Sequence, residues 1–306
     1  MKALKTLINN IRYLCRYNLK EIFNNTKNVY NVLDNEIQNI HYSLDHIKYE
    51  ITEDLNNLKS INIVNDNLQA INELIMSNRS FSRFGDGEVN LIFGNGIPFQ
   101  EYDENLSNRL KEVLKSNNEN LMLGIPNLFM SYEKVQYYVK KYDRVFYGKY
   151  TPMLLDLLSD KQIYYRVDIS FPYINKGANG FNYDNYYSEF RKIWDKKDIV
   201  IVCGDRVFNN INYNIYDNAS SINYIYAPTI NAYKYYDKIL NQIKTEENKN
   251  KIIMLILGPT ATILAYDLCN SGYRALDLGH LSKDYDAYKK NIVSNTENIT
   301  EFFNPD

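Results

Sequence analysis

Two carboxylates two residues apart, Asp86 and Glu88, lie in the segment RFGDGE at residues 83–88. Glycines on both sides of the aspartate permit a tight backbone, which presents both carboxylates where a strand ends and a helix begins. Such a pair suits a hard divalent cation that binds oxygen ligands and keeps positions open for phosphate oxygens. The same spacing is common where one acid caps a helix and another follows in its first turn. Spacing alone leaves both interpretations open.

A second group of titratable residues follows a buried run near the C-terminus. His280 is followed by Asp284 and Asp286, so three such side chains fall within seven residues. A cluster of this kind supplies a base for deprotonating a hydroxyl, or helps to hold a diphosphate or a metal. A histidine in a loop is also often structural, and the pattern does not decide between these roles.

A third candidate is the segment LGPTAT at residues 257–262. It is not a Walker loop, which requires GxxxxGK[ST], and the chain has no GxGxxG fingerprint. Gly258 nevertheless permits the next helix to approach an anion with its free N–H groups. Close packing of helix on strand is the alternative.

The elements that must position these residues alternate along the chain from about residue 66. Short apolar runs predict strands at 80–82, 121–125, 144–148, 163–167, 199–203, 222–227, 252–257 and 274–278. Helical spacing predicts helices at 104–117, 131–142, 185–196, 231–246, 260–271 and 284–292. This order predicts an α/β fold, a Rossmann-like, mainly parallel sheet with helices on both faces. Ligands of such sheets bind at the carboxyl ends of the strands, where all three candidate segments fall.

The N-terminal part of the chain has a different pattern. Residues 1–23 form a basic amphipathic helix, suited either to an anionic membrane surface or to packing on the protein or a partner. Apolar residues from Leu33 to Leu58 follow a near-heptad seam with one stutter. This seam predicts self-association through residues 30–60, or a helix folded back on its own domain. We expect residues 1–62 to form this helical segment and residues 63–306 to form the α/β domain.

Composition excludes several classes of function. The formal charge of −2 gives no general attraction for nucleic acid, and none is expected as a partner. The three cysteines lack the spacing of a disulfide framework or a zinc site. No apolar run is long enough to cross a bilayer. We therefore expect a cytoplasmic protein, peripheral at the inner face of the membrane if residues 1–23 bind lipid.

Taken together, the segments resemble the GT-D-fold glycosyltransferases, bacterial enzymes with a DxE motif. The resemblance runs from about residue 75 to 290 and rests on RFGDGE, GIP, FPYI, DNASSINYIYAPTINAY, LGPTATILAYDLCNSGYRALDLGH and DYDAY, in that order. It implies transfer of a hexose from a nucleotide sugar, a UDP-sugar by expectation, to a glycan or glycoprotein acceptor. The resemblance also implies Mn²⁺, or Mg²⁺, as cofactor.

The resemblance assigns roles residue by residue. It places the metal on Asp86 and Glu88, and proton transfer or metal binding on His280 with Asp284 or Asp286. The residues that it implies for the nucleotide sugar are Arg83, Gly85, Gly87, Asn231, Gly258, Pro259 and Thr260.

The chain departs from the family pattern at several positions. Phe171 stands where the family has arginine, and Asn175 where aspartate is usual. The segment 203–214 is remodelled, and Ala287 stands where tryptophan is expected. These changes motivate an alternative in which the chain is a catalytically weakened partner or scaffold for another glycosyltransferase. A different nucleotide-using α/β enzyme is a third hypothesis, disfavoured because the P-loop and dinucleotide fingerprints are missing.

Overall fold

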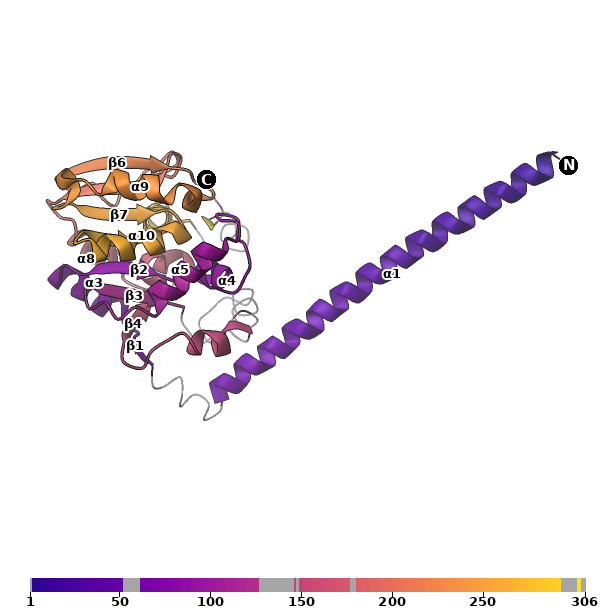
Figure 1. Cartoon of the computed structure of the whole chain (residues 1–306), viewed down its shortest axis with the longest axis horizontal. Helices are drawn as coiled ribbons and strands as arrows, with labels where there is room; N and C mark the ends of the chain where they lie inside the picture. The colour runs from indigo at the N-terminus through magenta and orange to yellow at the C-terminus, as the bar shows by residue number, and fades with distance from the viewer. Residues whose placement is uncertain are drawn as a thin grey trace.

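The body of the molecule is one twisted sheet with helices on both faces (Figure 1). The computed structural model describes residues 2–51, 61–126, 146, 149–176, 180–292 and 302–303. Within these residues the sheet has eight strands in the order β1-β4-β3-β2-β8-β7-β5-β6, and every pair of neighbouring strands is parallel. The predicted α/β class is confirmed.

Most predicted strands occur within one or two residues of their expected bounds. The strands are β1 (Asn62–Val64), β2 (Ser80–Arg83), β3 (Leu121–Ile125), β4 (Ile163–Arg166), β5 (Asp198–Gly204), β6 (Ser221–Ala227), β7 (Ile252–Ile256) and β8 (Arg274–Asp277). The short edge strand β1 was not predicted. The strand expected at 144–148 lies mostly outside the described residues, but Phe146, within it, is helical.

Side chains of the central strands alternate between two cores. In β5, Ile199 and Ile201 face one core, whereas Val200 and Val202 face the other. A strand buried on both faces reads as a continuous apolar run, which is why the sequence IVIVC indicated a central strand.

Helices of the described residues cover both faces of the sheet. One face carries α3 (Asn67–Met76), α7 (Pro172–Lys176), α8 (Tyr183–Arg191) and α11 (Leu281–Lys289). The other carries α4 (Asp86–Ile92), α5 (Glu104–Leu114), α9 (Tyr236–Ile243) and α10 (Pro259–Asn270). The helix expected at 231–246 is divided between the 3₁₀ turn η3 (Ala232–Tyr235) and α9, and that expected at 131–142 lies outside the described residues.

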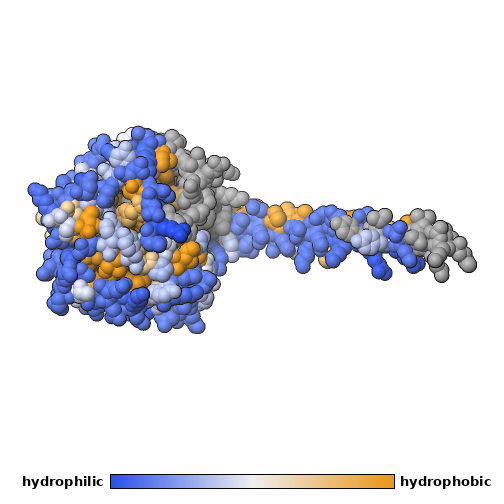
Figure 2. All heavy atoms as spheres, turned by 90° about the horizontal axis from the view of Figure 1, so that it is seen from above, coloured by the Kyte–Doolittle hydropathy of each residue, from blue (hydrophilic) through white to orange (hydrophobic). Residues whose placement is uncertain are grey.

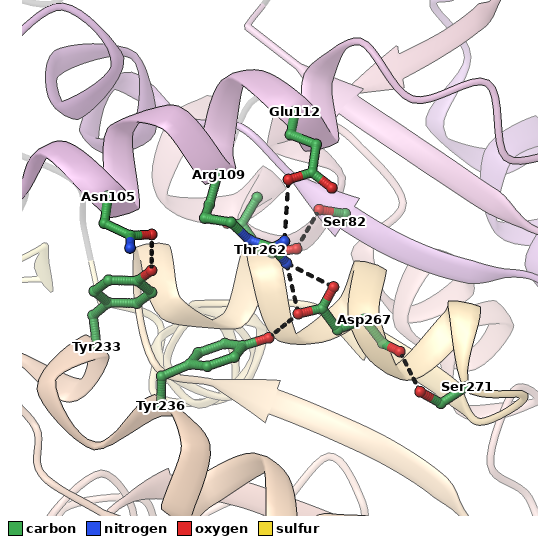
Figure 3. A network of polar contacts seen from close by, with 9 residues as sticks. All are labelled: Ser82, Asn105, Arg109, Glu112, Tyr233, Tyr236, Thr262, Asp267 and Ser271. Carbon is green, nitrogen blue, oxygen red and sulfur yellow. Dashed lines mark hydrogen bonds and ion pairs between the residues drawn. The ribbon is translucent and has the colours of Figure 1, made fainter.

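A polar network joins three of these helices across the second face (Figure 3). The guanidinium of Arg109 on α5 donates to both carboxylate oxygens of Asp267 on α10, each at 2.7 Å. The hydroxyl of Tyr236 on α9 donates to the same carboxylate. In addition, the Ser82 hydroxyl on β2 donates to the carbonyl of Thr262 at 2.8 Å, which fixes α10 against the sheet.

The N-terminal segment forms one long helix, α1 (Lys2–Ile51), that extends away from the body (Figure 1). The basic segment 1–23 and the first part of the seam predicted over residues 33–58 therefore belong to a single helix, and residues 52–60 lie outside the described part of the chain. None of the helices in the described residues has both the length and the hydropathy to cross a membrane.

The centre of the sheet contains a topological switch point. Strands β2 and β8 are neighbours, but the chain leaves β2 for α4 on one face and leaves β8 for α11 on the other. The two connections diverge at the carboxyl ends of these strands, the usual ligand-binding position in open α/β sheets.

Candidate functional site

The first wall of the candidate site is the turn from β2 into α4. β2 ends at Arg83, Gly85 is the N-cap of α4, and Asp86 is its first residue. The carboxylate of Glu88 reaches back and accepts a hydrogen bond from the Gly85 N–H at 2.7 Å, which forms half of a capping box. The N-cap is therefore Gly85 and not Asp86, the carboxylate of Glu88 contributes to the cap, and Asp86 is exposed beside it.

The two carboxylates differ in their surroundings. Glu88 is only 7% exposed, and this burial raises its pKa above the usual 4.5. Arg83 and the Gly85 N–H oppose that rise, whereas the negative charge of Asp86 adds to it. A cation beside the two carboxylates would lower the free-energy cost of ionising Glu88.

Arg83 lies among the other candidate residues, since its charge acts on Glu88, Asp277 and His280. Its Nε is 3.8 Å from an oxygen of Asp277 on β8, and it is buried without a hydrogen-bond partner among the described residues. The guanidinium lies 5.6 Å from the ring centroid of Phe171, the residue found where the family has arginine. Gly279 has a φ of +44°, and a Cβ there would lie 2.0 Å from an Arg83 nitrogen. Glycine at this position therefore makes room for the guanidinium.

Asp277 is the acid that the sequence interpretation did not assign. It ends β8, is 2% exposed, and accepts a hydrogen bond from the Thr262 hydroxyl at 3.3 Å. Burial raises its pKa to about 7, with Glu88 adding to the rise and Arg83 opposing it. Its place at the end of a strand, two residues before the glycine in RALDLGH, was the available signal.

His280 forms the second wall together with aromatic rings. It precedes α11, and its ring centroid lies 6.2 Å from Phe99, 5.4 Å from Phe302 and 5.0 Å from Phe303. Burial, then the charges of Arg83 and Lys283, hold its pKa well below 6.5. The imidazole is therefore neutral at pH 7, the form that a base requires, although the same burial and charges make it a weaker base than a free imidazole.

The start of α10 forms the third wall. Gly258 has a φ of +51° and caps the helix, and Pro259 occupies its first turn. The hydroxyl of Thr260 is buried without a partner in the described part of the chain. A Cβ on Gly258 would touch Phe99 at 3.6 Å, so this turn adjoins the aromatic wall.

Asn231 lies beside this wall and is hydrogen-bonded to the loop that carries Phe99. Its φ is +55°, its N–H donates to the carbonyl of Phe99 at 2.9 Å, and its side-chain oxygen accepts from the Glu101 N–H at 2.8 Å. These contacts hold the loop that carries Phe99. Gly87 approaches the same loop, because a Cβ there would lie 3.0 Å from Ile97.

Asp284 and Asp286 face other partners. The buried carboxylate of Asp284 accepts hydrogen bonds from the N–H groups of Tyr173 and Ile174 and from the Tyr187 hydroxyl, at 3.1, 2.9 and 2.6 Å.

Asp286 makes a similar set of contacts on another segment. It accepts from the N–H groups of Asn212 and Tyr213 and pairs with Lys290 at 2.6 Å. Both acids therefore anchor segments of backbone, and their predicted part in the reaction stays a prediction.

The described residues contain no group of three or more His, Cys, Asp or Glu side chains arranged to hold a metal. Two carboxylates on one helical turn remain, Asp86 and Glu88, with hard oxygen donors. Mn²⁺ and Mg²⁺ sites that serve phosphate substrates use one or two protein carboxylates, and phosphate and water oxygens complete them. The donor set fits such an ion.

Comparison with known proteins agrees with this geometry. The family model described as Glycosyltransferase GT-D fold matches residues 81–302. A probable glycosyl transferase, Gly, of Streptococcus gordonii is 34% identical over 222 residues, which are 72% of this chain and 32% of that protein. The glycosyltransferase GlyD of Streptococcus pneumoniae is 28% identical over 72% of this chain and 27% of its own length. The chain thus spans about a third or less of the length of these curated relatives.

Solved structures are similar over most of their length. A domain of unknown function 1792, described as having a distinct glycosyltransferase fold, superposes with a TM-score of 0.70 and 31% identity, over 78% of this chain and 84% of that one. A structure described as a new glycosyltransferase from Streptococcus sanguinis gives 0.70 and 29%, over 75% and 85%. With the family model matching 222 of its 306 residues, the chain belongs to the glycosyltransferase GT-D fold family.

Proposed function

We propose that this protein is a metal-dependent glycosyltransferase that moves a hexose from a nucleotide sugar, a UDP-sugar in our proposal, to a glycan or glycoprotein acceptor. The observation that carries the proposal is the convergence of Arg83, Glu88 and Asp277 at the carboxyl ends of β2 and β8. Family membership supports the reaction class, and the paired acids support the need for a cation.

The metal would be held by Asp86 and Glu88. Bound there, a divalent cation neutralises the charge that develops on the leaving nucleoside diphosphate. Glu88 is preset for this, because its bond to the Gly85 N–H fixes the carboxylate at the start of α4. Asp86 is exposed and reachable from solvent.

Arg83 supplies the second positive charge. The Asp277 carboxylate and the Phe171 ring both lie beside its guanidinium. The buried Nε has no hydrogen-bond partner among the described residues, so it could donate to an oxygen of the nucleotide sugar. A cationic side chain that is already held in place, away from water, stabilises developing negative charge well, because the side chain does not have to reorganise during the reaction.

His280 is the base in this proposal. Its neutral imidazole accepts the proton of the acceptor hydroxyl as the sugar transfers. The rings of Phe99, Phe302 and Phe303 beside it offer apolar faces on which a sugar or a base can stack. The turn at Gly258, Pro259 and Thr260 lines the donor side, and the buried Thr260 hydroxyl has no hydrogen-bond partner among the described residues.

The test is a release assay with a panel of nucleotide sugars, with and without Mn²⁺. We expect nucleoside diphosphate release from one UDP-sugar and its loss on chelation. The His280→Ala protein should still bind the nucleotide sugar, but its rate of nucleoside diphosphate release should be lower by about 100-fold or more. Release that is unaffected by chelation would contradict the metal site.

A second function, a weakened partner or scaffold for another glycosyltransferase, has one observation in its favour. Phe171 stands where the resemblance leads us to expect arginine, and its ring packs on Arg83. The candidate site therefore has one positive charge fewer than the expected pattern. Silence across the panel together with no binding of UDP and Mn²⁺ would favour this function. A cytoplasmic location, and contact of residues 1–23 with an anionic membrane surface, stay predictions.

A further inference from the structure

The long helix α1 exposes a continuous line of residues that the body does not cover. Figure 2 shows apolar patches between the polar residues along its described part. Its apolar members are 51–66% exposed, far more than core residues. The line, here named the α1 stripe, consists of Ile11, Cys15, Leu19, Ile22, Thr26, Val29, Leu33, Ile37, Ile40 and Leu44.

The spacing of the α1 stripe follows an 11-residue repeat. Ile11, Ile22, Leu33 and Leu44 recur every eleven residues, and two further members stand between each pair. Three positions in eleven residues give about 3.67 residues per turn, close to the period of a straight helix. The stripe therefore stays on one side of α1 for its whole length, about 50 Å at 1.5 Å per residue. A repeat of this kind is typical of helices that pair with little or right-handed supercoiling.

The charge of α1 is divided between its halves. Residues 2–27 contain six Lys or Arg and one Glu, whereas residues 28–51 contain four Asp or Glu and one Lys. Two copies side by side in the same direction would place like charges together. Two copies in opposite directions place each basic half beside an acidic half.

The α1 stripe is also nearly symmetric about its centre. When two copies run in opposite directions, Ile11 meets the partner's Leu44 and Ile22 meets the partner's Leu33. Cys15 then meets the partner's Ile40, and Thr26 meets the partner's Val29. Apolar residues face apolar residues at almost every level, as an antiparallel pair requires.

We propose that α1 is an antiparallel dimerisation helix, with residues 11–44 of one chain paired along the α1 stripe with residues 11–44 of a second copy. An anionic membrane is a poorer occupant, because the acidic half would be repelled from its surface. The pairing places the two catalytic bodies at opposite ends of a helical rod and does not depend on transferase activity.

Cysteine cross-linking of the full chain distinguishes antiparallel from parallel pairing. In the antiparallel pair, Cys15 of the two copies lie about 37 Å apart, since 25 residues separate their levels. The wild-type chain should therefore form no disulfide through Cys15 on mild oxidation. The Ile40→Cys chain should run mostly as a covalent dimer, because Cys15 then faces the new thiol of the partner.

The control for this reaction is the Cys15→Ser/Ile40→Cys chain. It should lose the cross-link, which a parallel dimer would keep through its two new thiols. The buried Cys203 and partly buried Cys269 are present in every variant and set the background. A wild-type dimer bridged through Cys15, or a doubly substituted chain that still cross-links, would overturn the antiparallel pairing.

Mass measured by light scattering tests the interface itself. The wild-type chain should have about twice the 36.1 kDa of one copy. Ile22→Asp, on the stripe at 61% exposure, should at least halve the dimer fraction at equal concentration. Tyr13→Asp, 70% exposed on the opposite side of α1, should leave it unchanged. A monomeric wild-type chain, including one that sediments with vesicles of anionic lipid, would overturn the proposal.

Discussion

At the scale of single residues, the contact between Gly279 and Arg83 is open to a matched test. Gly279→Ala should destabilise the fold and displace the guanidinium, because the new Cβ would meet its atoms at 2.0 to 3.1 Å. Gly272→Ala is the control, since Gly272 also has a positive φ, +81°, but has no neighbour within 4 Å.

Both variants should lose roughly 1–2 kcal/mol of unfolding free energy through backbone strain. Only Gly279→Ala should also weaken UDP binding, by about tenfold or more. Equal UDP affinities of the two variants, measured by calorimetry, would rule out Arg83 as a donor-binding group.

Asp277 makes the stability of the fold depend on pH in a defined direction. Its pKa is about 7 in the native state, above the ordinary 3.8, so the native state holds this proton more tightly than the unfolded state. The stability that the protonated group contributes is lost as the pH rises through about 7.

Asn resembles the neutral acid. Urea titrations of the wild type and of Asp277→Asn give the difference between their unfolding free energies at each pH. This difference, wild type minus variant, should fall by roughly 2 kcal/mol between pH 5 and pH 8. A difference that stays constant, or that grows with pH, would mean that Asp277 is ionised throughout.

At the scale of elements, Asp284 joins α7, α8 and α11 through one carboxylate. Asp284→Ala should cost roughly 2–4 kcal/mol of unfolding free energy, because two buried N–H groups and a hydroxyl lose their acceptor. Lys289→Ala, exposed near the end of the same helix, is the control and should change stability little.

If the role of Asp284 is structural, the folded Asp284→Asn chain should keep donor hydrolysis within about threefold of the wild type. A loss of turnover without loss of stability would restore the catalytic role suggested by the sequence.

The sequence predicted elements well where burial leaves a simple pattern. β5 and β7 read as unbroken apolar runs because both of their faces are covered. β1, with three residues at the sheet edge, is too short to leave such a pattern. The helical segment expected over 231–246 begins only after Asn231, because Asn231 takes a left-handed φ where it meets Phe99 and Glu101. The contact with Glu101 spans 130 positions, which local spacing does not reveal.

The sequence likewise predicted some features of the candidate site and not others. Arg83, Glu88, Gly258 and His280 were predicted to lie together because each follows a strand, and carboxyl ends of parallel strands share one edge. The backbone partners of Asp284 and Asp286 lie more than 70 positions away, so nothing near them in the sequence indicated that their carboxylates hold backbone N–H groups.

The many tyrosines also find an explanation at this scale. Several of them form the core beneath α8 and α11. Their rings fill space where most folds use aliphatic side chains, and the hydroxyls of Tyr186 and Tyr187 are satisfied by Ile169 and Asp284.

At the scale of the whole molecule, ligand binding should stabilise the body. UDP with Mn²⁺ at about 100 times its dissociation constant should add about 2.7 kcal/mol to the unfolding free energy. The melting temperature should then rise by roughly 5–10 °C. UDP with a chelator is the control and should shift it by less than a quarter as much. Equal shifts with and without the metal would mean that the nucleotide binds without a cation.

The central claim is that Asp86 and Glu88 hold the cation on the donor diphosphate, and calorimetry of UDP with Mn²⁺ on the wild type and on Glu88→Gln tests it most directly. Gln keeps an oxygen to accept the Gly85 N–H, so the cap and the fold should survive while the charge is lost. We predict saturable binding by the wild type that depends on Mn²⁺, and affinity at least about 100-fold weaker in Glu88→Gln with an unchanged melting temperature. Equal Mn²⁺-dependent affinity in the two proteins would contradict the account.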